Sequence, residues 1–476
     1  MPNRVVVLLS LAALLLPGRT AAQSFDPAEM ALFRALRRQP TALARYGYLD
    51  KAIPRLSPND RIVALQLLSS AECELGLYDQ AVLGFPVKIR TPQGLILPSP
   101  SEWRTGEAVD AIARLAADRR IVMINEAHHD AHTRTLTLAL LPRLRALGFN
   151  YFAAEALVDT DPALQRRGYP TRATGTEYLG DPVYGEIVRE AVRLGFTIVP
   201  YDPDSNVSTQ AREIGQADTL YRKVFAKDPR ARLFVHAGYA HIDKARGRLG
   251  DIEPMAMRLK ALTGFDPLSI DQTQFLETGW DRTDDYHRLI ARFHPKAPVV
   301  LIDRASGKLW SARPRLYDAN VILPPSASLK SFGDTDSING EAIENVSDPS
   351  RLMLGSLTAV NAMPRPKWLT LGGLRHPFPI SAALCRTHLP CTVEAQYAGE
   401  SDDAVAADRY AFMKGNAIST LYLFPGRYRL RSLDAKGKTL NVRSIAVDAP
   451  RADTSPAGRQ SARPLPAAGG TGHDGR

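Results

Sequence analysis

Residues 121–132, which read IVMINEAHHDAH, change abruptly from apolar side chains to acids and imidazoles. Glu126, His128 and His129 crowd together directly after the apolar run. A histidine that a carboxylate orients is suited to take a proton from water, because the pKa of an imidazole lies close to neutral pH. The same side chains also suit a divalent metal ion such as Zn or Mn. We therefore expect a functional site in this stretch, with Glu126, His128 and His129 as catalytic residues.

The elements on either side of these residues would place them at the edge of a sheet. The apolar run 121–124 predicts a short buried strand, and residues 133–147 carry leucines at helical spacing. On an ideal strand Glu126 and His128 would share one face while His129 points to the other, so the chain must turn here if all three converge. The cluster would then lie at the carboxyl edge of the sheet, where open α/β sheets usually bind ligands.

Strands and helices continue to alternate up to about residue 314. Short apolar strands separated by amphipathic helices predict an α/β fold with a largely parallel central sheet flanked by helices. Further strands are expected at residues 151–156, 197–201, 233–237, 267–270 and 298–302, and helices at 183–194, 211–225 and 252–263.

Polar residues fall toward the carboxyl ends of three more of these strands. Glu155, Asp202, His236 and His241 lie at or just after an apolar run. Because the carboxyl ends of parallel strands meet at one edge of a sheet, we expect these side chains to join the first cluster despite their distance in sequence. An acid that ends a strand is also a common helix N-cap, and Asp202 is open to that interpretation.

The expected roles follow from these positions. Glu155 and His241 complete the predicted catalytic set, and Asp202, His236 and Tyr239 are predicted to bind substrate. If a metal is bound, its predicted ligands are Glu126, His128, Glu155 and His241. The substrate is expected to be a small molecule or a peptide.

The chain beyond the α/β domain divides by composition. A basic residue, an apolar run and small residues at the N-terminus are typical of a signal peptide, so we expect an exported and periplasmic protein without an integral membrane segment after cleavage. Short alternating strands near the C-terminus predict a small β-sandwich-like domain. The expected parts are a signal peptide (1–22), a helical lead-in (23–104), the α/β domain (105–324), a linker or long loop (325–361), the β-sandwich-like module (362–449) and a disordered tail (450–476).

Charge and cysteine content narrow the function further. The formal net charge is +10, but the basic residues form short, scattered clusters without interleaved aromatic residues, so no nucleic-acid partner is expected. Cys385 and Cys391 bracket a loop long enough to close into a disulfide in an oxidising compartment. Cys73 lies in an apolar helical pattern and is expected to be a small buried residue. The oligomeric state is left open.

Three runs, NEAHHDAHTR, FAAEAL and HAGYAHI, resemble the superfamily that contains erythromycin esterases, haem-binding uptake proteins of the ChaN type, and the Tiki and TraB membrane-linked proteases. Members typically show a Gly-Glu pair closely followed by histidine, a second glutamate and a later Gly-x-x-His. Glu126 with His128 or His129 matches the first element, Glu155 the second, and residues 238–241 the third. The resemblance covers about residues 121–242.

What the resemblance implies differs between branches. Esterase-like members imply water activation by histidine and glutamate, the ChaN branch implies haem binding without turnover, and the Tiki branch implies a metal-dependent peptidase. Haem, a divalent metal and no cofactor are equally open. Asn125 stands where the family usually has glycine, which leaves a degenerate, non-catalytic scaffold as a further alternative. The favoured expectation is an exported hydrolase of an ester or peptide bond.

Overall fold

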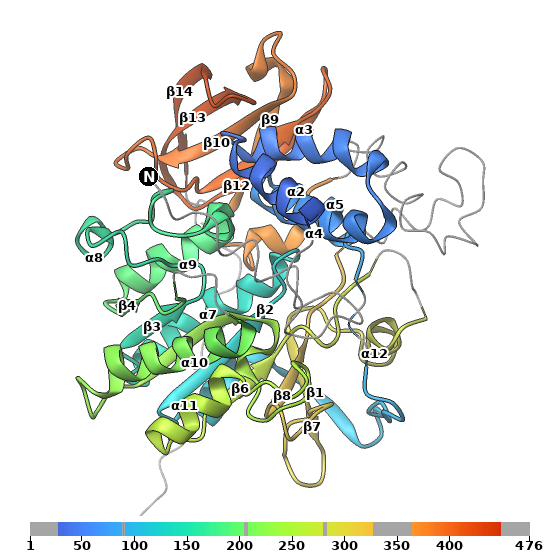
Figure 1. The fold of residues 1–476 in the computed structure, drawn as a ribbon, viewed down its shortest axis with the longest axis vertical. Helices are drawn as coiled ribbons and strands as arrows, with labels where there is room; N and C mark the ends of the chain where they lie inside the picture. Colours follow the sequence, from blue (N-terminus) through green and yellow to red (C-terminus); the bar gives the residue numbers. More distant parts are fainter. Residues whose placement is uncertain are drawn as a thin grey trace, which may run out of the picture.

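The computed structural model describes residues 27–87, 89, 91–203, 208–278, 283–326 and 364–448 (Figure 1). The predicted signal peptide and tail, and nearly all of the predicted linker, lie outside the described residues. Among the described helices none is both long and apolar enough to cross a membrane.

An eight-stranded sheet forms the centre of the α/β domain, in the order β1-β7-β8-β6-β2-β5-β3-β4. All neighbours from β8 to β4 pair in parallel, whereas β7 pairs antiparallel with both β1 and β8 at one edge. The largely parallel sheet is therefore confirmed. The strands are β1 (Trp103–Glu107), β2 (Ile121–Glu126), β3 (Tyr151–Ala154), β4 (Thr197–Val199), β5 (Leu233–Gly238), β6 (Leu268–Asp271), β7 (Val299–Asp303) and β8 (Ala319–Ile322).

Two of these strands were not expected from the sequence. β1 reads WRTGE, which carries neither an apolar run nor a clear apolar alternation, because this edge strand is partly exposed to solvent. β8 has four residues and follows a stretch without helical or strand periodicity. β1 pairs with β7, and β8 pairs with both β7 and β6, and local pattern does not reveal these tertiary contacts.

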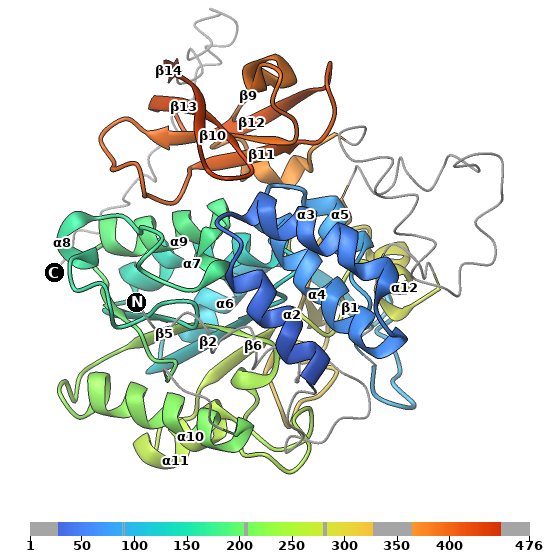
Figure 2. The same cartoon turned by 45° about the horizontal axis from the view of Figure 1, so that its top comes forward.

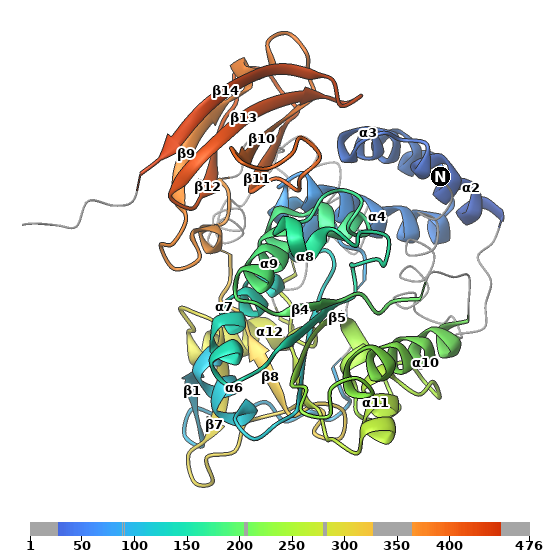
Figure 3. The ribbon, with the colours of Figure 1, turned by 90° about the vertical axis from the view of Figure 1, so that its left-hand side faces the viewer.

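Helices cover both faces of the sheet (Figure 3). Val122 and Ile124 of β2 pack with the leucines of helix α7, whereas Ile121 and Met123 pack under helices α10 and α11 on the opposite face. This alternation follows from the two-residue period of a strand. The helices are α6 (Ala108–Ala116), α7 (His132–Ala146), α8 (Leu164–Arg167), α9 (Pro182–Arg193), α10 (Thr209–Leu220), the π-helical turn η3 (Tyr221–Phe225), α11 (Met255–Thr263) and α12 (Asp285–Phe293).

The N-terminal helices lie between the α/β domain and the C-terminal strands (Figure 2). They share one hydrophobic cluster with those strands, in which Leu43 and Leu67 are buried together with Val393 and Leu421. The helical lead-in and the β-module therefore share a core. The elements are α2 (Pro27–Arg37), α3 (Ala42–Ala52), η1 (Ile53–Arg55), α4 (Pro58–Glu74), α5 (Tyr78–Leu83), η6 (Lys367–Thr370), β9 (His376–Ser381), η7 (Ala382–Cys385), β10 (Cys391–Tyr397), β11 (Asp408–Phe412), β12 (Ile418–Leu423), β13 (Gly426–Asp434) and β14 (Thr439–Val447).

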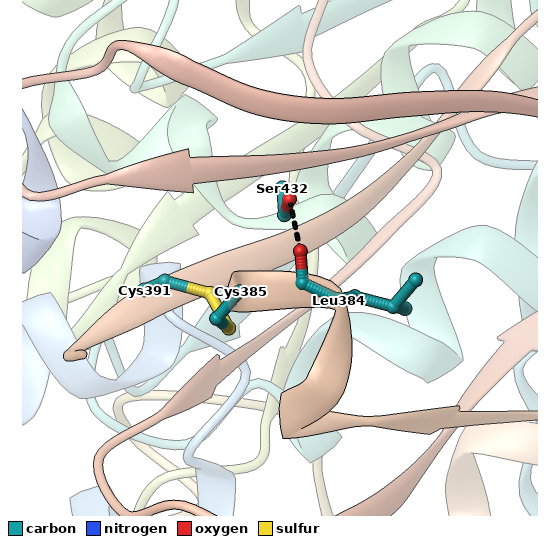
Figure 4. Close-up of a disulfide and its surroundings, with 4 residues drawn as sticks. All are labelled: Leu384, Cys385, Cys391 and Ser432. Atoms are coloured by element: carbon teal, nitrogen blue, oxygen red, sulfur yellow. Dashed lines mark hydrogen bonds between the residues drawn. A yellow bond between two sulfur atoms is a disulfide. The ribbon is translucent and has the colours of Figure 1, made fainter. Parts of the chain in front are cut away.

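The C-terminal strands form a four-stranded antiparallel sheet, β11-β10-β13-β14, and a two-stranded sheet, β12-β9. Both sheets contribute to the shared hydrophobic cluster, as expected for a sandwich-like arrangement. A disulfide joins Cys385 to Cys391, and a nearby hydrogen bond from the Ser432 hydroxyl to the Leu384 carbonyl oxygen holds η7 against β13 (Figure 4). The predicted disulfide pairing is present in the structure.

Candidate active site

A tight turn after β2 creates the candidate site. The amide of Asp130 donates to the carbonyl oxygen of Ala127, and the Asp130 carboxylate accepts the amide of His132 at the start of α7. The Thr133 hydroxyl closes the turn by donating to the Asp130 carbonyl oxygen. This turn supplies the bend that convergence requires, because it folds His128 back toward the end of its own strand.

Glu126 connects several buried groups at the end of β2. It is 2% exposed, and its Oε1 accepts a hydrogen bond from Nδ1 of His128 over 3.0 Å. Its Oε2 accepts Nε of the buried Arg134 from α7 and lies 3.4 Å from Nε2 of His236. Burial raises the pKa of Glu126, but the charges of Arg134 and His236 and the His128 hydrogen bond outweigh it and hold this pKa well below its usual range. Glu126 is therefore an ionised carboxylate.

The ionised Glu126 determines which nitrogen of His128 can accept a proton. Because a carboxylate only accepts, Nδ1 of His128 carries the proton and Nε2 keeps its lone pair when the imidazole is neutral. Nε2 is buried and has no hydrogen-bond partner within the described part of the chain. The ring stacks on Tyr178 at a centroid distance of 4.5 Å and meets Tyr239 edge-on at 5.1 Å. These contacts hold an imidazole whose free nitrogen can accept a proton.

Gly238, at the end of β5, makes room for that nitrogen. A β-carbon on Gly238 would lie 2.4 Å from Nε2 of His128 and 3.0 Å from Oε2 of Glu155. The two atoms are therefore no more than 5.4 Å apart. The missing side chain of Gly238 lets an imidazole and a carboxylate approach the same point from different strands.

Glu155 follows β3 and is held by a second set of charges. Its Oε2 accepts the Gly238 amide over 2.5 Å, and its Oε1 accepts Nη2 of Arg212 from α10 over 2.7 Å. Nε2 of His241 lies 3.5 Å from the same Oε1. Burial raises the pKa of Glu155, but His241 and Arg212 outweigh that effect and hold this pKa well below its usual range. The site thus contains two ionised glutamates.

His241, in the turn η4 (Tyr239–Ile242), is the second imidazole of the site. Its Nδ1 lies 2.6 Å from Oε1 of the fully buried Glu213 on α10. Burial lowers the pKa of His241, but Glu213 and Glu155 outweigh it and raise this pKa to about 10. His241 is therefore a cation at neutral pH, which suits it to hold Glu155 in the ionised form and not to act as a base.

His129 does not join the predicted catalytic set. Its ring stacks on Phe85 with centroids 3.4 Å apart, and its Nδ1 lies 3.2 Å from the Tyr239 hydroxyl. Its carbonyl oxygen accepts the thiol of the buried Cys73. Burial, reinforced by the charges of His128 and Arg134, lowers the pKa of His129 to about 3. The structure therefore favours His128 over His129 as the base.

The three predicted substrate-binding residues are all buried or ion-paired. His236 is fully buried, and its Nδ1 lies 2.9 Å from the Thr137 hydroxyl, a contact that fixes its ring beside Glu126. Both oxygens of Asp202 accept hydrogen bonds from Arg212, which makes Asp202 a partner of that arginine. Tyr239 packs between His128 and His129 and has a backbone φ of 40°, a strained value for a bulky residue. Among these three residues, Tyr239 makes a ring contact with His128, at a centroid distance of 5.1 Å.

Three charged residues of the site were missed from the sequence. Arg134 pairs with Glu126 and with Asp181, and Arg212 and Glu213 surround His241. A sequence signal for the arginines exists, since a buried carboxylate requires a counter-ion and each arginine lies in the first turn of a helix that follows a site strand.

The hydrogen bonds of Asn125 give a reason for an asparagine where the superfamily usually has glycine. Its amide nitrogen donates to the Tyr239 carbonyl oxygen over 2.8 Å and to Asp271 over 2.7 Å, and its amide oxygen accepts the Gln272 amide over 2.7 Å. This fully buried side chain ties the end of β2 to the segments that follow β5 and β6. It lies on the opposite face of β2 from Glu126, because successive side chains of a strand point to opposite faces.

The donor set does not suit a metal ion. All four carboxylate oxygens of Glu126 and Glu155 already accept hydrogen bonds, and each carboxylate is paired with a buried arginine. Among the described residues no group of three or more His, Cys, Asp and Glu side chains has the geometry to hold a metal. The expected ligand set of Glu126, His128, Glu155 and His241 is instead arranged as ion pairs.

Haem does not fit beside His128 either. Its free Nε2 faces Gly238 and Glu155, and Tyr178 and Tyr239 cover its ring. No porphyrin face can approach that nitrogen in this arrangement.

Comparison with known proteins leaves the family open. No family model and no curated protein matches the chain. Among solved structures, the type III effector HopBA1 is 15% identical over 38% of this chain and 85% of its own, with a TM-score of 0.27. A bacterial protein toxin is 18% identical over 35% of this chain and 36% of its own (TM-score 0.27). RRSP, a MARTX toxin effector domain from Vibrio vulnificus CMCP6, is 17% identical over 48% and 51% (TM-score 0.26). These similarities are too low to support an inference about fold or activity.

Proposed function

We propose that this protein is an exported hydrolase that activates water with His128 to cleave an ester bond. The observation that carries the proposal is the pairing of His128 with the ionised Glu126 through Nδ1, which leaves Nε2 free beside Glu155. A neutral imidazole oriented in this way is a general base suited to neutral pH.

In the first step Nε2 of His128 takes a proton from a water molecule, and the water oxygen attacks the carbonyl carbon of the ester. The imidazolium that forms is stabilised by Glu126, whose charge lies 3.0 Å from Nδ1. Oε2 of Glu155, which approaches the same point beside Gly238, would accept the second hydrogen of that water and orient it. When the tetrahedral intermediate collapses, Nε2 returns its proton to the departing alkoxide, and a carboxylic acid and an alcohol are released.

An ester is favoured over a peptide because its carbonyl carbon is more reactive than that of an amide, which resonance with the nitrogen lone pair stabilises. His128 can return its proton to either leaving group, so the preference rests on this difference in reactivity. The nitrogens of His241 face Glu155, Arg212 and Glu213, so it is not placed to supply a second acid.

Export and the relationship to the superfamily of erythromycin esterases are part of the proposal. The Cys385–Cys391 disulfide supports export, because such bonds persist in oxidising compartments. The convergence of Glu126, His128, Glu155 and His241 is consistent with the three motifs on which the resemblance rests.

The test is hydrolysis of 4-nitrophenyl acetate by the purified protein and its His128→Ala variant. We expect the variant to lose about 10²- to 10⁴-fold in kcat/KM, the usual contribution of a general base. His388→Ala, which removes an exposed histidine of the C-terminal region, is the matched control and should keep the full rate. Equal rates for all three proteins would refute the proposed role of His128, and cleavage of peptides but not esters would reassign the substrate class.

A further inference from the structure

A cavity of about 220 Å³ lies next to the loop that carries His128. It is lined by residues of α5 and the segment after it, and by residues that connect β6 to α12. Much of this lining is apolar, including Val82, Phe85, Phe275, Leu276 and Tyr286. A concave, apolar cavity with a few polar groups is the usual form of a small-molecule subsite.

His129 connects this cavity to the candidate site. Its ring lines the cavity, while its Nδ1 lies 3.2 Å from the hydroxyl of Tyr239, and the Tyr239 ring packs edge-on against His128. A molecule in the cavity would therefore contact the residue that directly follows the proposed base in the chain.

The charged side chains among the described residues that line the cavity are acidic. They are the carboxylates of Glu277, Asp284 and Asp285. His129 adds no positive charge, because burial lowers its pKa to about 3. The described lining therefore offers no cation with which a carboxylate, sulfonate or phosphate group could pair.

We propose that this cavity binds an uncharged apolar group of the ester, such as a short alkyl chain or a single ring. The assignment to an ester rests on the proposed function, whereas the binding of an uncharged apolar molecule does not. An apolar cavity of about 150 Å³ holds a molecule of the size of benzene, so about 220 Å³ has room for a short alkyl chain or a single ring. A cavity of this kind would make the enzyme prefer a hexanoyl ester to an acetyl ester.

Binding is tested first, with two fluorescent probes and the full-length mature protein. N-phenyl-1-naphthylamine is uncharged, and 8-anilinonaphthalene-1-sulfonate is a similar molecule with a negative charge. We expect the neutral probe to bind at least tenfold more tightly. Leu276→Trp, which fills the cavity, should weaken binding of the neutral probe at least tenfold. Leu115→Trp places the same side chain on an exposed position of α6 and should leave binding unchanged.

Selectivity is tested second, as the ratio of kcat/KM for 4-nitrophenyl hexanoate to that for the acetate. We expect Leu276→Trp to lower this ratio at least fivefold and Leu115→Trp to leave it unchanged. The inference is overturned if Leu276→Trp alters neither probe binding nor the ratio, or if the anionic probe binds more tightly. A third outcome is that the protein cleaves no ester but binds the neutral probe, and that Leu276→Trp abolishes this binding. The cavity would then remain a binding site, and only the proposed function would be refuted.

Discussion

Nε2 of His128 and Oε2 of Glu155 approach the same point beside Gly238, although they come from segments that follow different strands. The two atoms lie within 5.4 Å of each other, a separation that one water molecule can bridge with two hydrogen bonds. Glu126, which is paired with Arg134, holds the ring of the first atom through Nδ1, and the Gly238 amide donates a hydrogen bond to the second atom. The arrangement therefore places the proposed base and a second acceptor on the same side of Gly238.

Replacing Gly238 should disturb this arrangement directly. The backbone φ of Gly238 is −78°, which alanine adopts without strain, so any effect of Gly238→Ala comes from the added β-carbon. We expect displacement of His128 to lower the free energy of unfolding by about 1–3 kcal/mol and to lower kcat/KM at least tenfold. Urea unfolding and ester hydrolysis measure the two effects.

Gly47→Ala is the matched control for that substitution. Gly47 lies within helix α3, and a β-carbon there meets nothing within 4 Å. It should stabilise the protein slightly, since alanine favours a helix over glycine. Equal effects of the two substitutions would show that His128 does not occupy the space beside Gly238.

The Arg134–Glu126 pair should contribute far more than a surface pair on the same helix. Both side chains are at most 2% exposed, so Arg134→Met leaves a buried charge and should lower the free energy of unfolding by about 3–5 kcal/mol. Arg143→Met breaks the exposed pair with Asp110 and should cost less than about 1 kcal/mol. Similar losses for the two variants would contradict the buried ion pair.

Stability should fall in alkaline solution because of His241. Its pKa is raised from 6.5 to about 10, since Glu213 and Glu155 outweigh the effect of burial. The folded chain thus holds this proton more tightly than the unfolded chain. The resulting stabilisation is complete below about pH 6.5 and is lost as the pH rises through 10.

The free energy of unfolding in urea at pH 6.5 and pH 9.5 tests that expectation. Wild type should lose more stability over this interval than His241→Gln, which cannot be protonated. The same decrease in both proteins would show that His241 is neutral in the folded state.

Asn125→Ala should destabilise the fold without touching His128 or Glu126. It removes one of the hydrogen bonds to Asp271 and the acceptor of the Gln272 backbone amide, both of which are buried, and we expect a loss of about 2–4 kcal/mol. Asn441→Ala, on the edge strand β14, should change stability by less than about 0.5 kcal/mol. A thermal melt of each variant provides the comparison, and an unchanged midpoint for Asn125→Ala would contradict its role as a tie between strands.

The sequence alone determined five of the six strands that pair in parallel, their flanking helices and the edge at which Glu126, Glu155 and His241 gather. Periodicity is a local property, and the carboxyl ends of parallel strands must lie together, so these features needed no tertiary contacts. The sequence also sufficed for the disulfide, because a six-residue separation allows the two sulfurs to meet in a closed loop.

Tertiary structure decided which groups pair. The choice between His128 and His129 depended on the turn at Ala127 and on the Phe85 ring, which comes from the N-terminal helical region. The counter-ions Arg134 and Arg212, and the core shared by the N-terminal helices and the C-terminal strands, join segments distant in sequence. A buried charge requires a partner, but periodicity does not name it, because only packing brings that partner within hydrogen-bond distance.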